Sequence, residues 1–459
     1  MKISRNRIVC VLLSVLMIFG LFVAVSAQDT TAANTTGFYV DGTTIRDANG
    51  NEFIMRGVNH AYAWYKKEIE TAIKASAELG CNTVRIVVSD GQKYTKTTAE
   101  EIEMLTLMCM NYKVVPIFEV HDITGNNSTS KLNKTVNYWI SLKDVLQKYE
   151  KYVIVNIANE WMGQWGNGSG WSIAYQTAIQ NIRDAGIMNM IVVDAPGWGQ
   201  DGGACGDYCK EVFDADVEKN TIFSIHMYGS AGGKQSTIKS NIDGVLDDGV
   251  PVIIGEFGYY HSDGDVDEEY IMEYCTEKNV GYIGWSWKGN GGGVEYLDIA
   301  VEWDGSVLSS DWGENLFNGE NGIKATSEVC SIFTDGSTPE VSIPDAPESS
   351  EEESSVIDES TADSSVADTE DSSVPDDSSV SDSDSSTDSG SDDTQNDSTA
   401  GSVSTGGTSN SGSTGSSTSG SSTNTSTNKD VSTNTGASAL AFVGLALAGV
   451  AVVVTKKTK

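Results

Sequence analysis

Basic residues are scarce in this sequence. Its 459 residues include 29 Lys and Arg against 65 Asp and Glu, which gives a formal net charge of −36 at pH 7. The acidic excess extends into the part of the chain that we expect to fold, and an acidic surface repels phosphate backbones. We therefore expect no nucleic-acid partner.

Aromatic residues are absent from a long segment near the C-terminus. Between Glu340 and Gly436 there is no Phe, Trp or Tyr, whereas 21 residues are acidic and Ser and Thr form long runs. Such a segment cannot bury enough apolar surface to offset its conformational entropy. We predict a folded domain over 28–335 and a disordered, acidic Ser/Thr-rich linker over 336–436.

An apolar run near the N-terminus predicts export. Lys2, Arg5 and Arg7 precede the run from Ile8 to Val25, and small residues follow it up to Ala27. This pattern is typical of a secretory signal peptide over 1–27, with a signal-anchor helix as the alternative.

A second apolar run predicts attachment to the cell envelope. Ala437 to Val454 is uncharged and is followed by three lysines. As a helix it would measure about 27 Å, close to the roughly 30 Å of a hydrocarbon core. With Thr433-Asn434-Thr435-Gly436 before it, segment 437–459 also resembles the sorting signal of Gram-positive cell-wall proteins, although the usual Leu-Pro pair is missing. A transmembrane anchor and a sorting signal both predict an extracellular, surface-anchored protein.

Cysteine and histidine are too few for a disulfide scaffold or a zinc module. Six cysteines remain after the signal peptide, and the whole chain has four histidines. Cys205 and Cys209 are close enough to pair in a loop, and a disulfide and two free thiols stay open as alternatives. We expect no cofactor, and we expect a monomer.

Short apolar runs alternate with stretches of helical spacing over the folded part. Eight parallel strands in such βα units close a (β/α)8 TIM barrel, an α/β fold of about 250 residues. The turn at Asp41-Gly42 predicts an N-terminal β-hairpin at the bottom of the barrel. We expect the connection 196–221 to be irregular. The predicted strands are 53–60, 83–88, 114–121, 153–160, 190–195, 222–228, 252–257 and 281–287, and the predicted helices are 68–79, 99–110, 136–149, 174–185, 237–246 and 268–278.

Most of the predicted strands end in polar or aromatic residues. In a barrel these ends meet at the C-terminal rim, where the active sites of this fold lie. Two carboxylates stand out at these ends, Glu160 and Glu256, and a buried Glu without a partner is costly. Capping or salt-bridged acids are one reading. A facing pair, one protonated and one ionised, is the other, and it is what a retaining glycoside hydrolase requires.

Several motifs together resemble glycoside hydrolase family 5. They are Ile157-Ala158-Asn159-Glu160-Trp161, Ile225-His226-Met227-Tyr228 and Ile254-Gly255-Glu256-Phe257-Gly258, with Arg85 and His121 in addition. The segments Met55–Ala61, Ala195–Gln200 and Trp285–Asn290 resemble the bacterial endo-β-1,4-mannanases of that family. The likeness runs from about Gly37 to Phe333.

The resemblance implies a role for each matched residue. Glu160 would be the acid/base and Glu256 the nucleophile, with Arg85 and Tyr228 bonded to Glu256. Asn159 would hold the hydroxyl at C2 of the substrate. His121 and His226 would orient hydroxyls and the acid, unless they are ordinary core histidines, and His60 is a further candidate for a substrate contact.

Tryptophan is abundant, with ten residues, and a pyranose stacks on aromatic rings. Trp64 and Trp198 are candidate sugar platforms. Trp285 and Trp287 lie two residues apart at the end of one predicted strand, and we expect one of them to face the barrel mouth. The acidic cluster after His261 could bind calcium or cap the next helix.

Three functions remain in view. The resemblance implies an endo-β-1,4-mannanase acting on mannan, glucomannan or galactomannan. A β-1,4-glucanase would use the same two glutamates, and a surface carbohydrate-binding protein would need neither.

Overall fold

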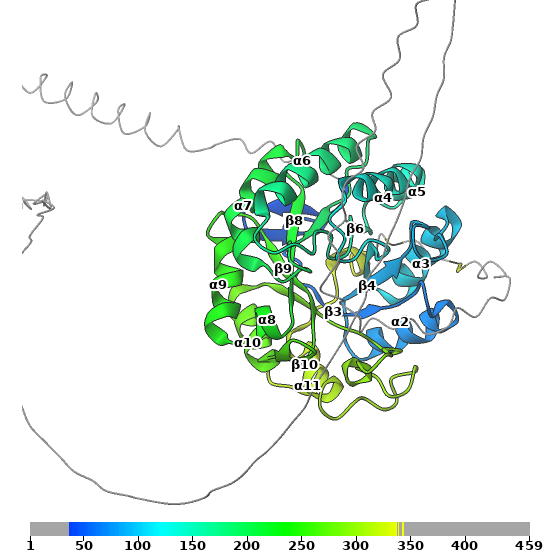
Figure 1. Cartoon of the computed structure of the whole chain (residues 1–459). Coiled ribbons are helices and arrows are strands. Elements are labelled where there is room, and N and C mark those ends of the chain that lie inside the picture. Colours follow the sequence, from blue (N-terminus) through cyan, green and yellow to red (C-terminus); the bar gives the residue numbers. More distant parts are fainter. Residues whose placement is uncertain (1–35, 337, 339–341, 344–459) are drawn as a thin grey trace, which may run out of the picture. The chain divides into compact units, whose positions relative to one another are not determined.

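Eight parallel strands form a closed barrel in a computed structural model that describes residues 36–336, 338 and 342–343 (Figure 1). The predicted apolar runs become these strands, and nearly every residue in them is buried. They are β3 (Arg56–His60), β4 (Thr83–Val88), β5 (Val115–Val120), β6 (Ile154–Asn156), β7 (Ile191–Asp194), β8 (Thr221–Met227), β9 (Val252–Phe257) and β12 (Gly281–Gly284). The (β/α)8 barrel is therefore confirmed.

The strands follow one another in chain order around the barrel, and β12 closes it by pairing with β3 and β9. One register shift interrupts the ladder, between Ile225 and His226 on β8, so that His226 pairs with Glu256. Strand β6 ends at Asn156, so the predicted strand 153–160 was too long and Glu160 lies on the loop beyond it.

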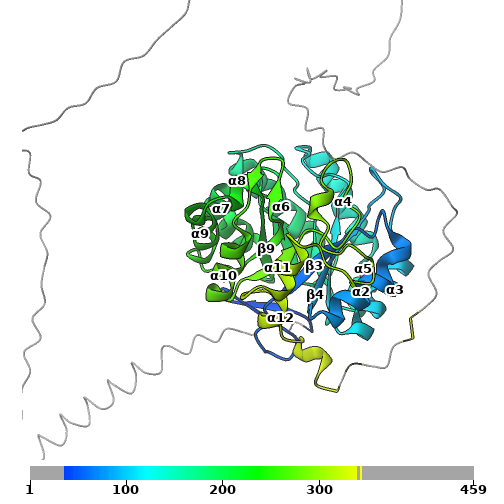
Figure 2. The same cartoon turned by 90° about the horizontal axis from the view of Figure 1, so that it is seen from below.

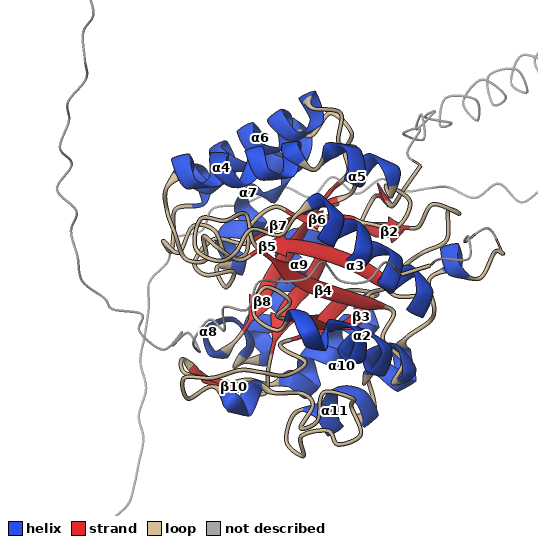
Figure 3. Cartoon of the chain, turned by 90° about the vertical axis from the view of Figure 1, so that its right-hand side faces the viewer, coloured by secondary structure: helices blue, strands red, loops and turns tan. Residues whose placement is uncertain are grey.

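Helices surround the strands, as Figures 1 and 3 show, and bury their apolar faces against them. In α3 the start is fixed by a capping box, in which Thr98 accepts from the Glu101 backbone and Glu101 accepts from the Thr98 backbone. The main helices are α2 (Ile69–Glu78), α3 (Ala99–Tyr112), α4 (Thr129–Ser141), α5 (Lys143–Lys148), α6 (Gly168–Asp184), α7 (Gly202–Ala215), α9 (Gln235–Leu246) and α10 (Glu268–Lys278).

Two helix predictions were wrong in part. The predicted helix 136–149 is two helices, α4 and α5. The connection 196–221, predicted to be irregular, contains α7, which begins where the Asp201 side chain accepts from the Ala204 backbone. The glycines at its start have low helix propensity, which hid α7 from a reading of the sequence.

Shorter elements cover both ends of the barrel. The hairpin of β1 (Tyr39–Asp41) and β2 (Thr44–Arg46) forms as predicted. Asn220, at the N-terminal end of β8, donates to the Phe38 carbonyl, which places the start of the hairpin at the bottom of the barrel (Figure 2). The remaining elements are η1 (Lys66–Glu68), α8 (Gly229–Gly232), β10 (Tyr260–His261), β11 (Gly264–Asp265), η2 (Glu295–Leu297), α11 (Gly313–Asn318), α12 (Ile323–Thr326) and η3 (Ser331–Phe333).

All six cysteines of the described region are buried free thiols. Cys205 and Cys209 lie on α7 and are free thiols, so of the two alternatives the disulfide is not formed. Burial raises the pKa of the Cys209 thiol to about 12, which keeps it protonated.

The predicted signal peptide 1–27, nearly all of the linker 336–436 and the apolar segment 437–459 lie outside the described residues. The described residues all fall within one compact unit. Among the helices that the structure describes, none combines the length and the apolar character that a membrane span needs.

Candidate active site

Glu256 lies near the end of β9 with both carboxylate oxygens bonded. The Arg85 guanidinium donates to its Oε1 at 2.7 Å, and the Tyr228 hydroxyl donates to its Oε2 at 2.9 Å. The side chain is almost fully buried. A charge-assisted bond on one oxygen and a hydroxyl donor on the other fix the direction in which this carboxylate points.

Arg85, on β4, is the centre of a buried polar network. Its five donors face oxygens contributed by other strands and their ends, and the side chain has no exposed surface. Burial alone would lower the pKa of the guanidinium, but the carboxylates of Glu119, Glu256 and Asp194 outweigh it and raise the pKa. Besides Glu256, the partners of Arg85 are Asn59 at 2.9 Å, Asn156 at 2.9 Å, Asn159 at 2.7 Å, Asp194 at 3.4 Å and Glu119 at 3.8 Å.

Glu160 follows β6 in a left-handed backbone conformation, with φ at 46°. Such a φ is uncommon outside glycine and is held here from both sides. The Glu160 N–H donates to Asp194 Oδ2 at 3.0 Å, and the Glu160 carbonyl accepts from the Gly125 N–H at 3.1 Å. The turn directs the carboxyl towards His226, whose Nδ1 lies 2.8 Å from Glu160 Oε1.

The two glutamates lie in different electrostatic settings. Burial raises the pKa of Glu160 to about 7, although His226 opposes that rise. Burial also acts against protonation of His226, but the carboxylates of Glu256, Asp194 and Glu160 outweigh it and raise the pKa of the imidazole to about 10. His226 is therefore an imidazolium at neutral pH and donates to Glu160.

The register shift on β8 and a glycine on β9 bring these groups together. A side chain at Gly255 would collide with the Ser224 hydroxyl, since its Cβ would lie 2.2 Å from Oγ. Gly199, with φ at 72°, leaves room for the His226 ring in the same way and accepts from the His226 N–H at 2.8 Å. Glu160, His226 and Glu256 consequently each present a ligand-type atom within 4.8 Å of the other two.

A metal fits this cluster poorly. The ligand-type atoms of these residues already have protein partners: His226 Nδ1 pairs with Glu160 Oε1, and the two oxygens of Glu256 accept from Arg85 and Tyr228. Among the described residues no other group of His, Cys, Asp and Glu is this compact. In the predicted calcium cluster, Asp263 accepts from the Gly229 and Ser230 backbone, and Asp267 caps α10, which is the alternative we had set beside calcium.

Other predicted residues join the same rim. Asn159 donates to Thr124 and lies 3.5 Å from His121, whose other nitrogen is 3.0 Å from Glu119. Trp285 stacks on His121 with ring centroids 5.6 Å apart, and Trp64 meets His121 edge-on at 5.2 Å. His121 is thus held between two tryptophans beside the carboxylates.

His60 and Trp287 are not brought into the site. His60 is buried against Trp303, and among the described residues neither of its ring nitrogens has a hydrogen-bond partner. Its neighbour Asn59 faces the barrel interior instead. Trp287 is fully buried and donates to the Trp303 carbonyl, so of the two it is Trp285 that lies at the mouth.

Trp198 lies on the loop after β7 and is 40% exposed. Its ring packs on Gly125 and Gly163, where an added Cβ would come within 3.0 Å of it. These glycines follow β5 and β6, so Trp198 is an open aromatic surface on the C-terminal face.

Four residues of the network were not predicted from the sequence. Each has a polar side chain turned into the barrel near a strand end, and Asp194 could have been found by the rule that selected the other strand ends. The four are Asn59, Glu119, Asn156 and Asp194.

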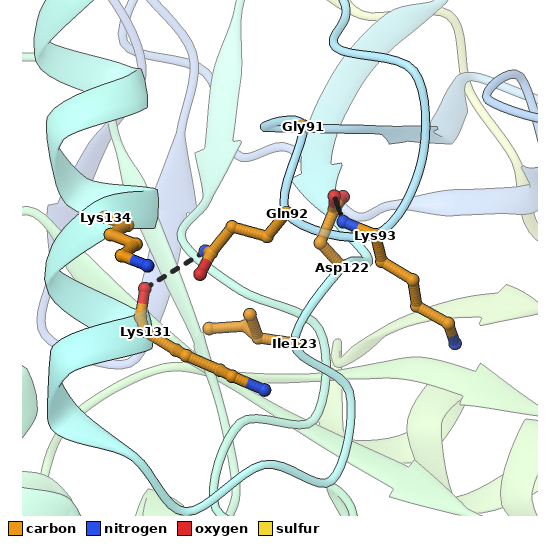
Figure 4. A pocket seen from close by; sticks show the side chains of 7 residues that line it. All are labelled: Gly91, Gln92, Lys93, Asp122, Ile123, Lys131 and Lys134. Atoms are coloured by element: carbon orange, nitrogen blue, oxygen red, sulfur yellow. Dashed lines mark hydrogen bonds between the residues drawn. The ribbon is translucent and has the colours of Figure 1, made fainter.

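An open pocket of about 490 Å³ lies beside the site (Figure 4). It shares Asp122 and Ile123 with the loop that follows His121, and Asp122 Oδ1 accepts from the Lys93 N–H at 2.7 Å. Neither Glu160 nor Glu256 lines it. Its lining is Gly91, Gln92, Lys93, Asp122, Ile123, Lys131 and Lys134.

Two buried carboxylates this close, one with a pKa near neutrality, on the C-terminal rim of a (β/α)8 barrel define a glycoside hydrolase of the retaining type. Residues 46–291 match the cellulase (glycosyl hydrolase family 5) family. The chain belongs to this family.

The chain is also similar to mannanases in sequence and in fold. The chain is 49% identical over 299 residues to a mannan endo-1,4-beta-mannosidase of Salipaludibacillus agaradhaerens, covering 65% of this chain and 96% of that protein. It is 38% identical over 342 residues to a mannan endo-1,4-beta-mannosidase of Streptomyces lividans, and the match covers 73% of this chain and 88% of that protein. Its fold resembles the mannohexaose complex of Thermomonospora fusca beta-mannanase, with 41% identity, a TM-score of 0.61 and coverage of 65% and 99%.

Proposed function

We propose that this chain is an endo-β-1,4-mannanase, which hydrolyses internal bonds of mannan, glucomannan or galactomannan with retention of configuration. The observation that carries the proposal is the approach of Glu160 and Glu256 within 4.8 Å. Retaining enzymes place their two carboxyl groups about 5–5.5 Å apart, whereas inverting enzymes need about 6.5–9.5 Å to admit a water. The short separation favours a covalent intermediate.

In the first step Glu256 attacks the anomeric carbon while the bond from that carbon to the glycosidic oxygen breaks. The proton of Glu160 passes to this oxygen, so the departing chain leaves as an alcohol. The sugar is then an ester of Glu256, and Glu160 is a carboxylate. Arg85 and Tyr228 aim Glu256, and His226 orients the carboxyl of Glu160.

In the second step Glu160 takes a proton from water, and the water oxygen attacks the anomeric carbon. The ester bond to Glu256 breaks, which restores both side chains. Two inversions at one carbon return the original configuration. The Asn159 amide would bind the hydroxyl at C2, the carbon next to the anomeric carbon.

The similar proteins favour mannan as the substrate, because two of them are named mannan endo-1,4-beta-mannosidase and the solved structure is a mannohexaose complex of a beta-mannanase. A β-1,4-glucanase is the alternative, since glucose differs from mannose only in the orientation of the C2 hydroxyl. The aromatic surfaces of Trp64, Trp198 and Trp285 would stack on either sugar.

Release of reducing sugar from galactomannan, glucomannan and carboxymethyl-cellulose tests the proposal, with Glu256→Gln as the inactive control. Release from the two mannans is expected. Release from cellulose alone would reassign the substrate, and release from none would favour a carbohydrate-binding protein. Proton NMR of the first product formed distinguishes retention from inversion.

We propose further that the enzyme acts as a monomer outside the cell, held at the envelope by segment 437–459. The apolar and basic residues of both terminal segments support this location. Fractionation of the native host tests it: activity in the soluble cytoplasmic fraction would contradict the proposal.

A further inference from the structure

Asp194 is a fully buried carboxylate at the end of β7 whose oxygen Oδ2 faces three groups of the site. It accepts from the Glu160 N–H at 3.0 Å, lies 3.4 Å from Nε2 of His226, and lies 3.4 Å from the Arg85 guanidinium. The reaction steps proposed above assign no role to this side chain.

We infer that Asp194 is a positioning residue of the reaction: it holds the backbone of the acid/base Glu160 and keeps His226 charged, so that the imidazolium presents a donor to the Glu160 carboxyl. The inference rests on the proposed roles of Glu160 and Glu256.

The first part of the inference concerns the Glu160 backbone. The left-handed turn at Glu160 costs free energy, and its N–H would be an orphan donor in a buried place without Asp194. Because the turn sets the direction of the side chain, a shift of the N–H moves the carboxyl. A misplacement of about 1 Å at a reacting group can cost on the order of a hundredfold in rate.

The second part concerns the charge of His226. Carboxylates lie at both nitrogens of its ring. Glu160 and Glu256 face Nδ1 at 2.8 and 3.4 Å, and Asp194 faces Nε2 at 3.4 Å. Asp194 is the only one of these three that takes no part in bond making, so its charge is constant through the cycle. It can therefore stabilise the imidazolium while Glu160 gains and loses its proton.

The surroundings of Asp194 keep it ionised and in place. The groups that face it are Arg85 on β4, His226 on β8, Tyr175 on α6 and Cys205 on α7. Burial acts against its charge, but His226 and Arg85 outweigh it and lower the pKa of Asp194 to about 2. The Asp194 carbonyl also accepts from the Trp171 indole at 2.9 Å, which anchors the end of the strand.

Nitrogen-15 NMR of histidine-labelled protein tests the charge directly. With four histidines in the chain, a His226→Asn sample assigns the signal. In the wild type the His226 ring should be an imidazolium at pH 8. In Glu256→Gln, where Asp194 still faces the ring, it should be an imidazolium at pH 7. A neutral ring in either sample overturns the inference, and neither sample depends on how Asp194 variants fold.

Asp194→Asn then tests both parts. The His226 ring should lose its proton at least tenfold more readily, and kcat on galactomannan should fall roughly ten- to a hundredfold. Asp216→Asn is the matched control, because Asp216 is another fully buried carboxylate beside an arginine, Arg183, away from the site. It should lower the melting temperature and change neither readout.

Asp194→Asn with an unchanged titration of His226, or with kcat within twofold of the wild type, refutes the inference. Failure of the proposed function is a separate result. It would appear either as a wild type without turnover or as turnover that survives Glu160→Gln and Glu256→Gln, while the NMR titration stays as expected.

Discussion

Replacement of Glu160 by Gln removes the proton donor and little else. The amide has nearly the same volume, and its oxygen can keep the bond from His226 Nδ1, which spans 2.8 Å in the wild type. Since the pKa of Glu160 is about 7, roughly nine-tenths of the enzyme carries the catalytic proton at pH 6. The variant therefore loses general acid catalysis at a pH where the wild type has nearly all of it.

The expected loss depends on the leaving group. A sugar alcohol departs poorly without a proton, so kcat/KM on galactomannan should fall about 10²–10⁴-fold, a barrier increase of about 3–5 kcal/mol. A 2,4-dinitrophenyl β-mannobioside needs little acid help, so its kcat/KM should change far less. Its kcat should fall, because Glu160 also activates the water of the second step.

The assay compares kcat/KM on both substrates at pH 6 for the wild type, Glu160→Gln and Glu211→Gln. Glu211 is an exposed glutamate on α7, and its variant should match the wild type on both substrates. Equal fold-losses of Glu160→Gln on the polymer and the aryl glycoside would refute the assignment of Glu160 as the acid.

Four further predictions follow from the same geometry. In a pH profile, kcat/KM should fall as pH rises through about 7, because burial raises the pKa of Glu160 and the acid form is lost above it; a limb above pH 9 would contradict this. Glu256→Gln should abolish turnover but still bind mannohexaose within about tenfold in calorimetry, and residual turnover above a thousandth would count against a nucleophile. Asp216→Ala leaves Arg183 buried without its two hydrogen bonds to Asp216 at 2.9 Å, so the free energy of unfolding measured in urea should fall by roughly 3–5 kcal/mol. A fall of less than about 1 kcal/mol would contradict this prediction. Truncation after Ile343, which still packs on the core, should leave specific activity on galactomannan unchanged.

The barrel and its catalytic pair could be predicted because both depend on local patterns. Apolar runs of strand length marked the eight strands, and parallel strands in a barrel expose their C-terminal ends on one rim. A polar residue at such an end is therefore placed near the others whatever the details of packing. Glu160, Glu256, Arg85, His121, Asn159, His226 and Tyr228 all meet there.

The choice between neighbouring residues could not be predicted in the same way. His60 was taken as a site residue, but its neighbour Asn59 is the one bonded to Arg85. In a strand successive side chains point to opposite faces, so a shift of one residue exchanges inside and outside. Trp285 and Trp287 could not be told apart for a different reason: residues two apart in a strand share a face, but β12 ends at Gly284, and the structure buries Trp287 and places Trp285 beside His121.

By itself, the sequence determined the order of the strands and the kinds of chemical group that the rim carries, because periodicity and composition are properties of short segments. Only the tertiary structure decided that Glu160 and Glu256 approach within 4.8 Å, that His226 lies near both and that Asp194 contacts Glu160, His226 and Arg85. Those distances follow from the closure of the barrel, from the register shift on β8 and from the left-handed turn at Glu160. Each depends on pairing between segments far apart in the chain, which no short stretch of residues encodes.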